Sequence, residues 1–260
     1  MNQAPYGPAD LGIPPLPGPE FIELLHQQRK ETFPEPPEFY QTLIEGSLDR
    51  ESLQLWVKDL YYYWDYGMRF STGALITKNN DNETRGKMFR KLVRIEGKNV
   101  VNDLNPEWDM PSYEEMWLGL GEALGLSREE ITSFHMYTRS YFAVSTLCVL
   151  SRWWEWSWLD GIASLYAADL LGRDYMPQVH EALKSHYGVA DEYLQFFSVY
   201  LEDVTESVPW EEEALSFWAC TTERQLSAAR AFRSRLAIED QLLLPLHHMA
   251  SGERVPFQVP

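Results

Sequence analysis

The longest apolar stretch of the chain covers residues 141–171 and reads YFAVSTLCVLSRWWEWSWLDGIASLYAADLL. Serine, arginine, glutamate and aspartate interrupt it too often for a membrane-spanning helix, which needs about 20 mostly apolar residues. The pattern instead predicts two helices in a protein core, which meet near Leu159–Gly161.

Asp169 interrupts the apolar face of the second of these helices. Ile162, Leu165 and Tyr166 recur at the spacing of one helix face, and Asp169 is the next position on that face. A carboxylate at a core position is costly unless another group pairs with it. Asp169 is therefore the first candidate functional residue.

Composition and charge indicate a globular protein and argue against two kinds of binding partner. The 260 residues are 45% hydrophobic, as in a globular protein, and carry a formal net charge of −17. This charge argues against nucleic acid and against an anionic membrane surface as partners. The two cysteines lie far apart, and the chain does not begin like a signal peptide. We therefore expect a cytoplasmic protein.

Helical periodicity runs through most of the chain, and no segment alternates like a strand over more than a few residues. The helical patterns are mostly about 10–20 residues long and joined by short connections. We predict an all-α bundle with a single domain over residues 20–250. A proline-rich arm, residues 1–19, precedes it, and a loose tail, residues 251–260, follows.

A second acid interrupts an apolar pattern between Thr84 and Lys98. This segment is predicted to be a helix that buries Phe89, Leu92 and Val93, with Glu96 as the next position on the same face. Glu96 is therefore the second candidate functional residue.

Prolines and glycines set three further boundaries. A separate helix is predicted over Met176–Tyr187, and Pro209 is expected to open another over residues 210–237. Gly67 is expected to bend the helix that begins near Asp49. Beyond that bend Arg69 shares a stripe with tyrosines and is predicted to point inward.

The predicted inward-facing polar groups come from several helices. They are Glu96, Asp169, Tyr200 and Asp203, with Arg69, Tyr62, Tyr63 and Tyr66 nearby. Carboxylates from different helices of a bundle can hold a metal or act as acid and base. They can equally form buried ion pairs with Arg69, Arg94 or Arg139. Both interpretations remain open.

Several motifs resemble the haem-oxygenase-like superfamily, within it the group of pyrroloquinoline-quinone synthase and thiaminase II. These motifs are LQLWVKDLYYYW (53–64), MWLGLGEALGLSREEI (116–131), IASLYAADLL (162–171), HYG (186–188) and FFSVY (196–200). The resemblance implies a single all-helical domain with a central pocket, usually in a dimer.

The resemblance also implies where functional groups would lie, and most of those positions are altered here. Metal-dependent oxidases of this kind would use Glu96 and, as a shorter acid, Asp169, while a histidine position falls on Asp103 or Tyr113. Three later ligand positions fall on Tyr200, Val204 and Ser207. In the cofactor-free quinone-synthase branch, an arginine position also falls on Tyr200.

We therefore expect an oxidoreductase, an oxidase or oxygenase, that acts on a small aromatic or electron-rich intermediate in a central pocket. The expected catalytic residues are Glu96, Asp169 and Tyr200. The expected substrate-binding residues are Tyr62, Tyr63, Arg69, Tyr166 and Asp203.

The expected co-substrate is O2, with either no cofactor or iron held by Glu96 and Asp169, and the expected assembly is a homodimer. Two alternatives stay open. One is a binding protein of the same fold without catalysis, and the other is a metal-dependent oxidase with an altered set of acidic ligands.

Overall fold

A computed structural model describes residues 14–98, 109–153 and 155–252 of the chain. Within these residues all regular secondary structure is helical, so the predicted all-α class is confirmed. Residues 1–13 of the predicted arm, the position Asp103 and residues 253–260 of the predicted tail lie outside the described residues.

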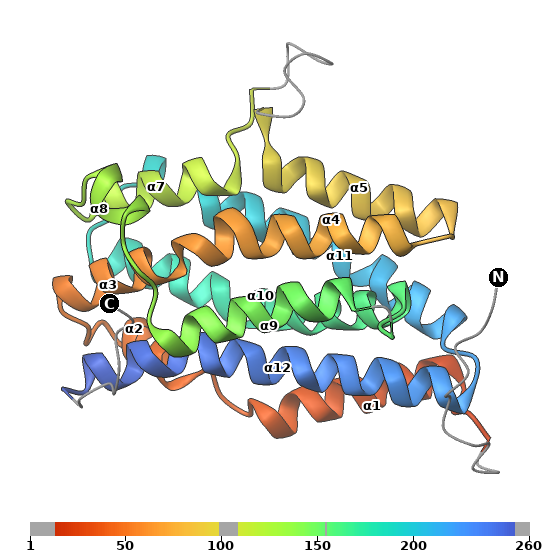
Figure 1. Ribbon diagram of the computed structural model, residues 1–260. Helices are drawn as coiled ribbons and strands as arrows, with labels where there is room; N and C mark the ends of the chain where they lie inside the picture. The colour runs from red at the N-terminus through yellow and green to blue at the C-terminus, as the bar shows by residue number, and fades with distance from the viewer. Residues whose placement is uncertain (1–13, 99–108, 154, 253–260) are drawn as a thin grey trace.

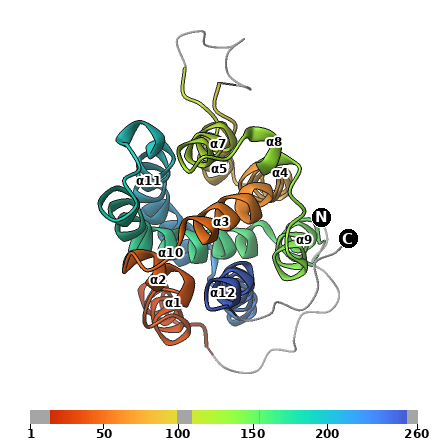
Figure 2. The same cartoon turned by 90° about the vertical axis from the view of Figure 1, so that its left-hand side faces the viewer.

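The long helices run side by side, and α10 lies in the middle of the bundle when it is viewed end-on (Figures 1 and 2). The helices of the bundle are α1 (Gly18–Thr32), α2 (Glu38–Ile44), α3 (Arg50–Tyr62), α4 (Met68–Lys78), α5 (Asn82–Glu96), α7 (Tyr113–Ala123), α8 (Arg128–Thr132), α9 (Thr138–Arg152), α10 (Trp158–Ser185), α11 (Gln195–Trp218) and α12 (Thr222–Ala250). Helix α10 packs against α11, α12, α2 and α4.

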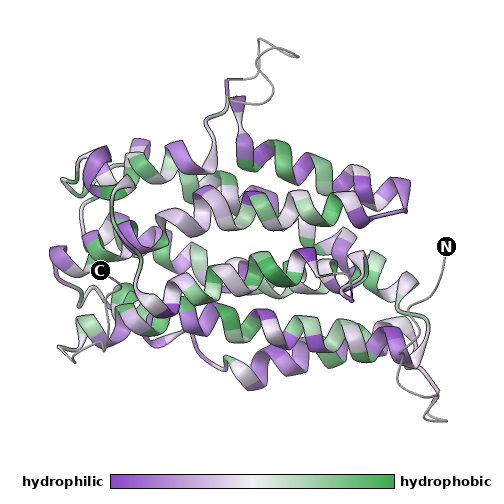
Figure 3. Cartoon of the chain, in the orientation of Figure 1, coloured by the Kyte–Doolittle hydropathy of each residue, from purple (hydrophilic) through white to green (hydrophobic). Residues whose placement is uncertain are grey.

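Helix α10 is central because its first half is buried on every side. Every residue from Leu159 to Gly172 is buried, and a helix that is apolar all round must be covered by other elements. Ser157 and Asp160 form a capping box at its start. The outer helices mix hydrophilic and hydrophobic residues along their length, as helices with one buried face do (Figure 3). None of the described helices is both long and apolar enough to cross a bilayer.

Two predicted boundaries around α10 were wrong. The break near Leu159–Gly161 lies earlier, because α9 ends at Arg152 and α10 begins at Trp158. The separate helix over Met176–Tyr187 is the last part of α10, which continues through Pro177. Packing along both flanks of this proline outweighs the one backbone hydrogen bond that proline removes.

The boundary predicted at Pro209 was wrong for the same reason. Helix α11 continues through Pro209 to Trp218, with Val208 and Glu211 buried on either side of the proline. The predicted helix over residues 210–237 therefore divides between the end of α11 and the start of α12 at Thr222.

The buried face of α5 also differs from the prediction. Phe89 is 54% exposed, and Leu92 and Val93 are only half-buried. The buried residues are Thr84, Met88, Lys91 and Ile95. Lys91 lies on this buried face, although a pattern of apolar residues alone would place a lysine at the surface. Glu96 consequently lies beside the buried face.

The predicted bend at Gly67 is a π-helical turn, η1 (Tyr63–Gly67), between α3 and α4. Such turns widen the helix by one residue and often occur at functional sites. Tyr63 and Trp64 are both buried at its start.

Candidate functional site

A small cavity of about 40 Å³ lies inside the bundle, beside the π-helical turn. This volume accommodates roughly one or two water molecules. Its lining comes from the start of α2 and from α3, η1, α10, α11 and α12. The polar residues of the lining are Tyr40, Tyr63, Tyr175, Tyr200 and Glu239.

Tyr63 and Glu239, which line this cavity, form a hydrogen-bonded triad with Arg235. The Tyr63 hydroxyl lies 3.0 Å from Oε1 of Glu239, and Nε of Arg235 donates to the same oxygen at 2.7 Å. Nη2 of Arg235 also contacts the Tyr63 hydroxyl. The Arg235 side chain is fully buried, and its Nη1 has no hydrogen-bond partner among the described residues. The triad therefore holds one free donor inside the protein.

The protonation states of this triad follow from burial and charge. Burial raises the pKa of Tyr63 well above its usual value, although the Arg235 charge opposes this. Burial lowers the pKa of Arg235, but Tyr63 and Glu239 outweigh that effect and raise it. Tyr63 is therefore a neutral donor and Arg235 a permanent cation beside the Glu239 carboxylate.

Tyr200 also lines the cavity. Its ring stacks on Phe196 with centroids 5.8 Å apart, and burial raises its pKa well above the usual value. A Cβ atom at Gly172 of α10 would overlap the Tyr200 hydroxyl. The glycine therefore lets this hydroxyl approach the backbone of the central helix.

A second polar cluster surrounds Lys91. The Lys91 ammonium lies 2.7 Å from Asp169, 3.0 Å from Asp203 and 3.1 Å from the Ser207 hydroxyl. Tyr113 also donates to Asp203, at 3.1 Å. Burial alone would lower the pKa of Lys91, but Asp169 and Asp203 outweigh it and raise this pKa. The ammonium is therefore fully charged.

Glu211 adds a third carboxyl group to this Lys91 cluster. Oδ1 of Asp169 and both carboxyl oxygens of Glu211 are buried and lack a donor among the other described residues. Burial and the negative charge of Asp169 raise the pKa of Glu211 well above its usual value. A neutral Glu211 can then donate its proton to Asp169, which satisfies both groups.

The metal centre implied by the resemblance does not fit these residues. The ammonium of Lys91 occupies the space between Asp169 and Ser207, two of the implied ligand positions. Across the described ranges, no three His, Cys, Asp or Glu side chains are arranged as metal ligands.

Glu96 and Asp169 lie in different networks. Glu96 faces Arg69, with 3.7 Å between the Arg69 Nε and a carboxylate oxygen, and Arg69 also pairs with Asp65 at 3.1 Å. Burial raises the pKa of Glu96, against the charge of Arg69. The Arg69 side chain is 41% exposed, so the predicted inward orientation was wrong. Neither Glu96 nor Arg69 lines the central cavity.

Tyr62 and Tyr166 also lie away from the cavity. Tyr62 stacks on Tyr66 with centroids 5.0 Å apart. Tyr166 donates to Glu212 at 2.8 Å and lies 3.0 Å from Nε2 of His26. Of the eight residues predicted for the site, Tyr63 and Tyr200 line the cavity and Asp169 and Asp203 join the Lys91 cluster.

The sequence patterns missed four charged residues of these two sites, namely Lys91, Glu211, Arg235 and Glu239. The i, i+4 spacing of Arg235 and Glu239 is a recognisable helical ion-pair signal. A helix end predicted at residue 237 separated the two. Lys91 and Glu211 carry no such signal, because their burial depends on carboxylates from other helices.

Solved structures share this arrangement of helices. A domain with a heme oxygenase-like fold from Shewanella denitrificans OS217 has a TM-score of 0.68 and 14% identity, covering 92% of this chain and 98% of that one. A CADD-like protein from Nostoc punctiforme PCC 73102 also has a TM-score of 0.68 and 14% identity, with 89% and 99% covered. The fold is therefore the predicted haem-oxygenase-like one.

Sequence comparisons point to the same group. The 4-aminobenzoate synthase of Chlamydia pneumoniae is 25% identical over 198 residues, which are 75% of this chain and 81% of that enzyme. The pyrroloquinoline-quinone synthase of Acinetobacter baumannii (strain AYE) is 26% identical over 159 residues, 59% of this chain. The match spans only 56% of that enzyme's length. The TENA/THI-4/PQQC family profile matches residues 34–241, and the chain belongs to this family.

Proposed function

We propose that this protein is a biosynthetic enzyme that oxidises a small aromatic or electron-rich molecule at the central cavity, which must widen from about 40 Å³ to admit that molecule. The observation that carries this proposal is the triad of Tyr63, Arg235 and Glu239, in which a carboxylate and a neutral hydroxyl line the cavity and a buried cation is bonded to both. Two relatives named as synthases support a biosynthetic role.

Glu239 is the proposed general base. Its side chain is 17% exposed and borders the cavity, so its carboxylate can accept a proton from a substrate held there. The Tyr63 hydroxyl is the donor that would stabilise the negative charge left on the substrate, and Arg235, which is bonded to Tyr63 and Glu239, would support it through its charge. Tyr200, which also lines the cavity, would contact the ring.

Dioxygen is the proposed electron acceptor. Removal of a proton makes an electron-rich substrate more easily oxidised, and two electrons and two protons from it reduce O2 to hydrogen peroxide. In this scheme the chain's own residues move the proton and hold the anion, and no step depends on a metal.

The test incubates purified protein with a small-molecule extract under isotopically labelled O2 and follows every compound by mass spectrometry. The proposal predicts that one small aromatic compound disappears, with the label appearing in hydrogen peroxide. Turnover without uptake of O2 would contradict the oxidase proposal.

A binding protein without catalysis is the second candidate. The pairing of Asp169 and Asp203 with Lys91, of Glu96 with Arg69, and the small cavity all favour it. It predicts that one compound of the extract is retained by the protein and recovered unchanged. Metal analysis separates the remaining alternative, because a metal-dependent oxidase would carry stoichiometric iron or manganese.

A further inference from the structure

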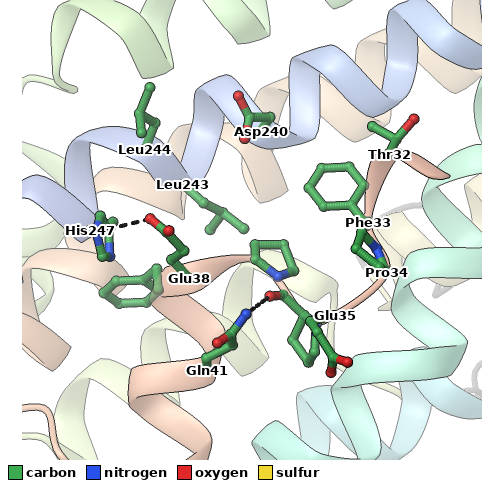
Figure 4. Close-up of a pocket in the computed structure, with 13 residues that line it drawn as sticks. Thr32, Phe33, Pro34, Glu35, Glu38, Gln41, Asp240, Leu243, Leu244 and His247 are labelled. Carbon is green, nitrogen blue, oxygen red and sulfur yellow. Dashed lines mark hydrogen bonds and ion pairs between the residues drawn. The ribbon is translucent and has the colours of Figure 1, made fainter. Parts of the chain in front are cut away.

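A surface groove of about 350 Å³ lies between α12 and the linker that joins α1 to α2 (Figure 4). The linker, residues 33–37, contains three prolines and forms one wall. Asp240, Leu243, Leu244 and His247 of α12 form the other wall. The groove is large enough for a small ring, whereas the central cavity is not.

The groove and the central cavity share two residues of their lining. Pro37 and Leu243 border both spaces. On α12, Glu239 lines the cavity and the next residue, Asp240, lines the groove. The two spaces therefore lie on either side of one thin wall.

The other described grooves do not reach the cavity. One of about 430 Å³ lies between α5 and α11, and another of about 240 Å³ lies near Trp210. Neither shares a lining residue with the central cavity. Elsewhere the cavity is closed by core residues of α10 and α11 such as Ala168 and Tyr200, whose displacement would open the hydrophobic core.

The linker wall is held by contacts that can break without unfolding a helix. The Tyr175 hydroxyl lies 3.1 Å from the Phe33 carbonyl oxygen and 3.2 Å from that of Glu35. The Gln41 side chain donates to the Pro36 carbonyl at 2.7 Å. Because Tyr175 also lines the central cavity, its hydroxyl ties the linker to the cavity wall.

The charge of the groove favours some molecules over others. Glu35, Glu38 and Asp240 line it, and the one basic side chain in its described lining, His247, pairs with Glu38 at 3.0 Å. A groove with excess carboxylate attracts cations and repels anions.

We propose that this groove is the binding site through which a neutral or positively charged small molecule enters the cavity, and that Pro37 and Leu243 determine which molecules pass. The proposal rests on the proposed function, because it assumes that the central cavity is where the molecule is used. In this proposal the linker and Tyr175 hold the groove wall in position and take no part in the reaction.

The test follows three probes with the same ring, benzylamine, benzyl alcohol and benzoate, by NMR and stopped-flow binding. We expect the cationic and neutral probes to bind at least about tenfold more tightly than benzoate. Leu243→Trp should slow association by about tenfold, whereas Leu226→Trp, at an exposed position of α12 outside the groove, should leave it within about twofold. Tyr175→Phe, which frees the linker, should speed association.

Tyr175→Phe keeps the proposal testable if Leu243→Trp fails to fold. Equal association rates in wild type, Tyr175→Phe and Leu243→Trp would overturn the proposal, and so would tight binding of benzoate. These results are independent of turnover. Probe entry by this route, together with no oxidation of any compound in the extract, would refute the proposed function and leave the entrance standing.

Discussion

Glu239 and Glu96 are both half-buried carboxylates beside an arginine, yet Glu239 borders a cavity and Glu96 does not. A general base needs the proton that it abstracts within hydrogen-bond reach. At the scale of single residues, access to a cavity therefore separates a candidate base from a structural ion pair. The same criterion places Asp169 on the structural side, because Lys91 and Glu211 enclose it.

The raised pKa of Glu211 predicts a pH-dependent stability. Its pKa in the folded state lies well above the value of about 4.3 expected in the unfolded chain, so folding binds a proton. Stability then falls as pH rises above the unfolded pKa, by about 1.4 kcal/mol per pH unit for one proton. Glu211→Gln keeps a donor toward Asp169 and should remove this slope. Urea unfolding of both proteins between about pH 5 and 8 measures it, and identical slopes would show that Glu211 is ionised in the folded state.

Lys91 should be essential to stability. Lys91→Met leaves the carboxylates of Asp169 and Asp203 buried without their central cation. Removing one partner of a buried ion pair costs about 3–5 kcal/mol, which urea unfolding at neutral pH measures. The double variant Lys91→Met with Asp169→Asn should recover part of this loss. A single variant as stable as wild type would show that the cluster is hydrated and loosely held.

Single residues were predictable from the sequence where they interrupt a strong pattern. Asp169 stands out because Ile162, Leu165 and Tyr166 define its face, and all four are buried. Lys91 does not stand out, because only carboxylates on α10 and α11 make its burial favourable. Glu239 did not stand out either, because the helix was predicted to end at residue 237 and no apolar face was followed beyond that end.

At the scale of helices, the contact between α10 and α11 depends on Gly172. Gly172→Ala places a Cβ against the Tyr200 hydroxyl, which must move into the cavity or away from α10. We expect a loss of about 1–3 kcal/mol in the free energy of unfolding, as for other overpacked cores. The matched control is Gly86→Ala on α5, which meets no atom within 4 Å and should gain about 0.5–1 kcal/mol. Equal effects in thermal or urea unfolding would contradict the close approach of Tyr200.

Helices were predictable from the sequence where the apolar pattern extends over many residues. Helix ends were predicted less well where a proline occurs. Pro177 and Pro209 both lie inside helices, since the buried residues around them outweigh a single lost hydrogen bond. The π-helical turn at Tyr63 is visible in the sequence only as a possible bend at Gly67. Tyr63 begins this turn and lines the cavity, so the sequence did not reveal how the backbone places Tyr63 at the site.

At the scale of the whole molecule, the all-α class followed from composition and periodicity, and the comparisons bear out the family resemblance. The homodimer implied by that resemblance remains a prediction. Light scattering after size exclusion should give twice the mass of the chain. A net charge of −17 makes two copies repel each other, so dissociation should increase at low salt. A single-chain mass at every salt concentration would contradict the dimer.

The most direct test of the central claim compares two rival bases in one turnover assay. Glu239→Gln removes the carboxylate at the cavity, and Glu96→Gln removes the one that the sequence pattern favoured. If the cavity beside Tyr63 and Arg235 is the reaction site, Glu239→Gln should lower turnover by about 100-fold or more, and Glu96→Gln should leave it within about twofold. Full turnover in Glu239→Gln, with loss in Glu96→Gln, would contradict this assignment.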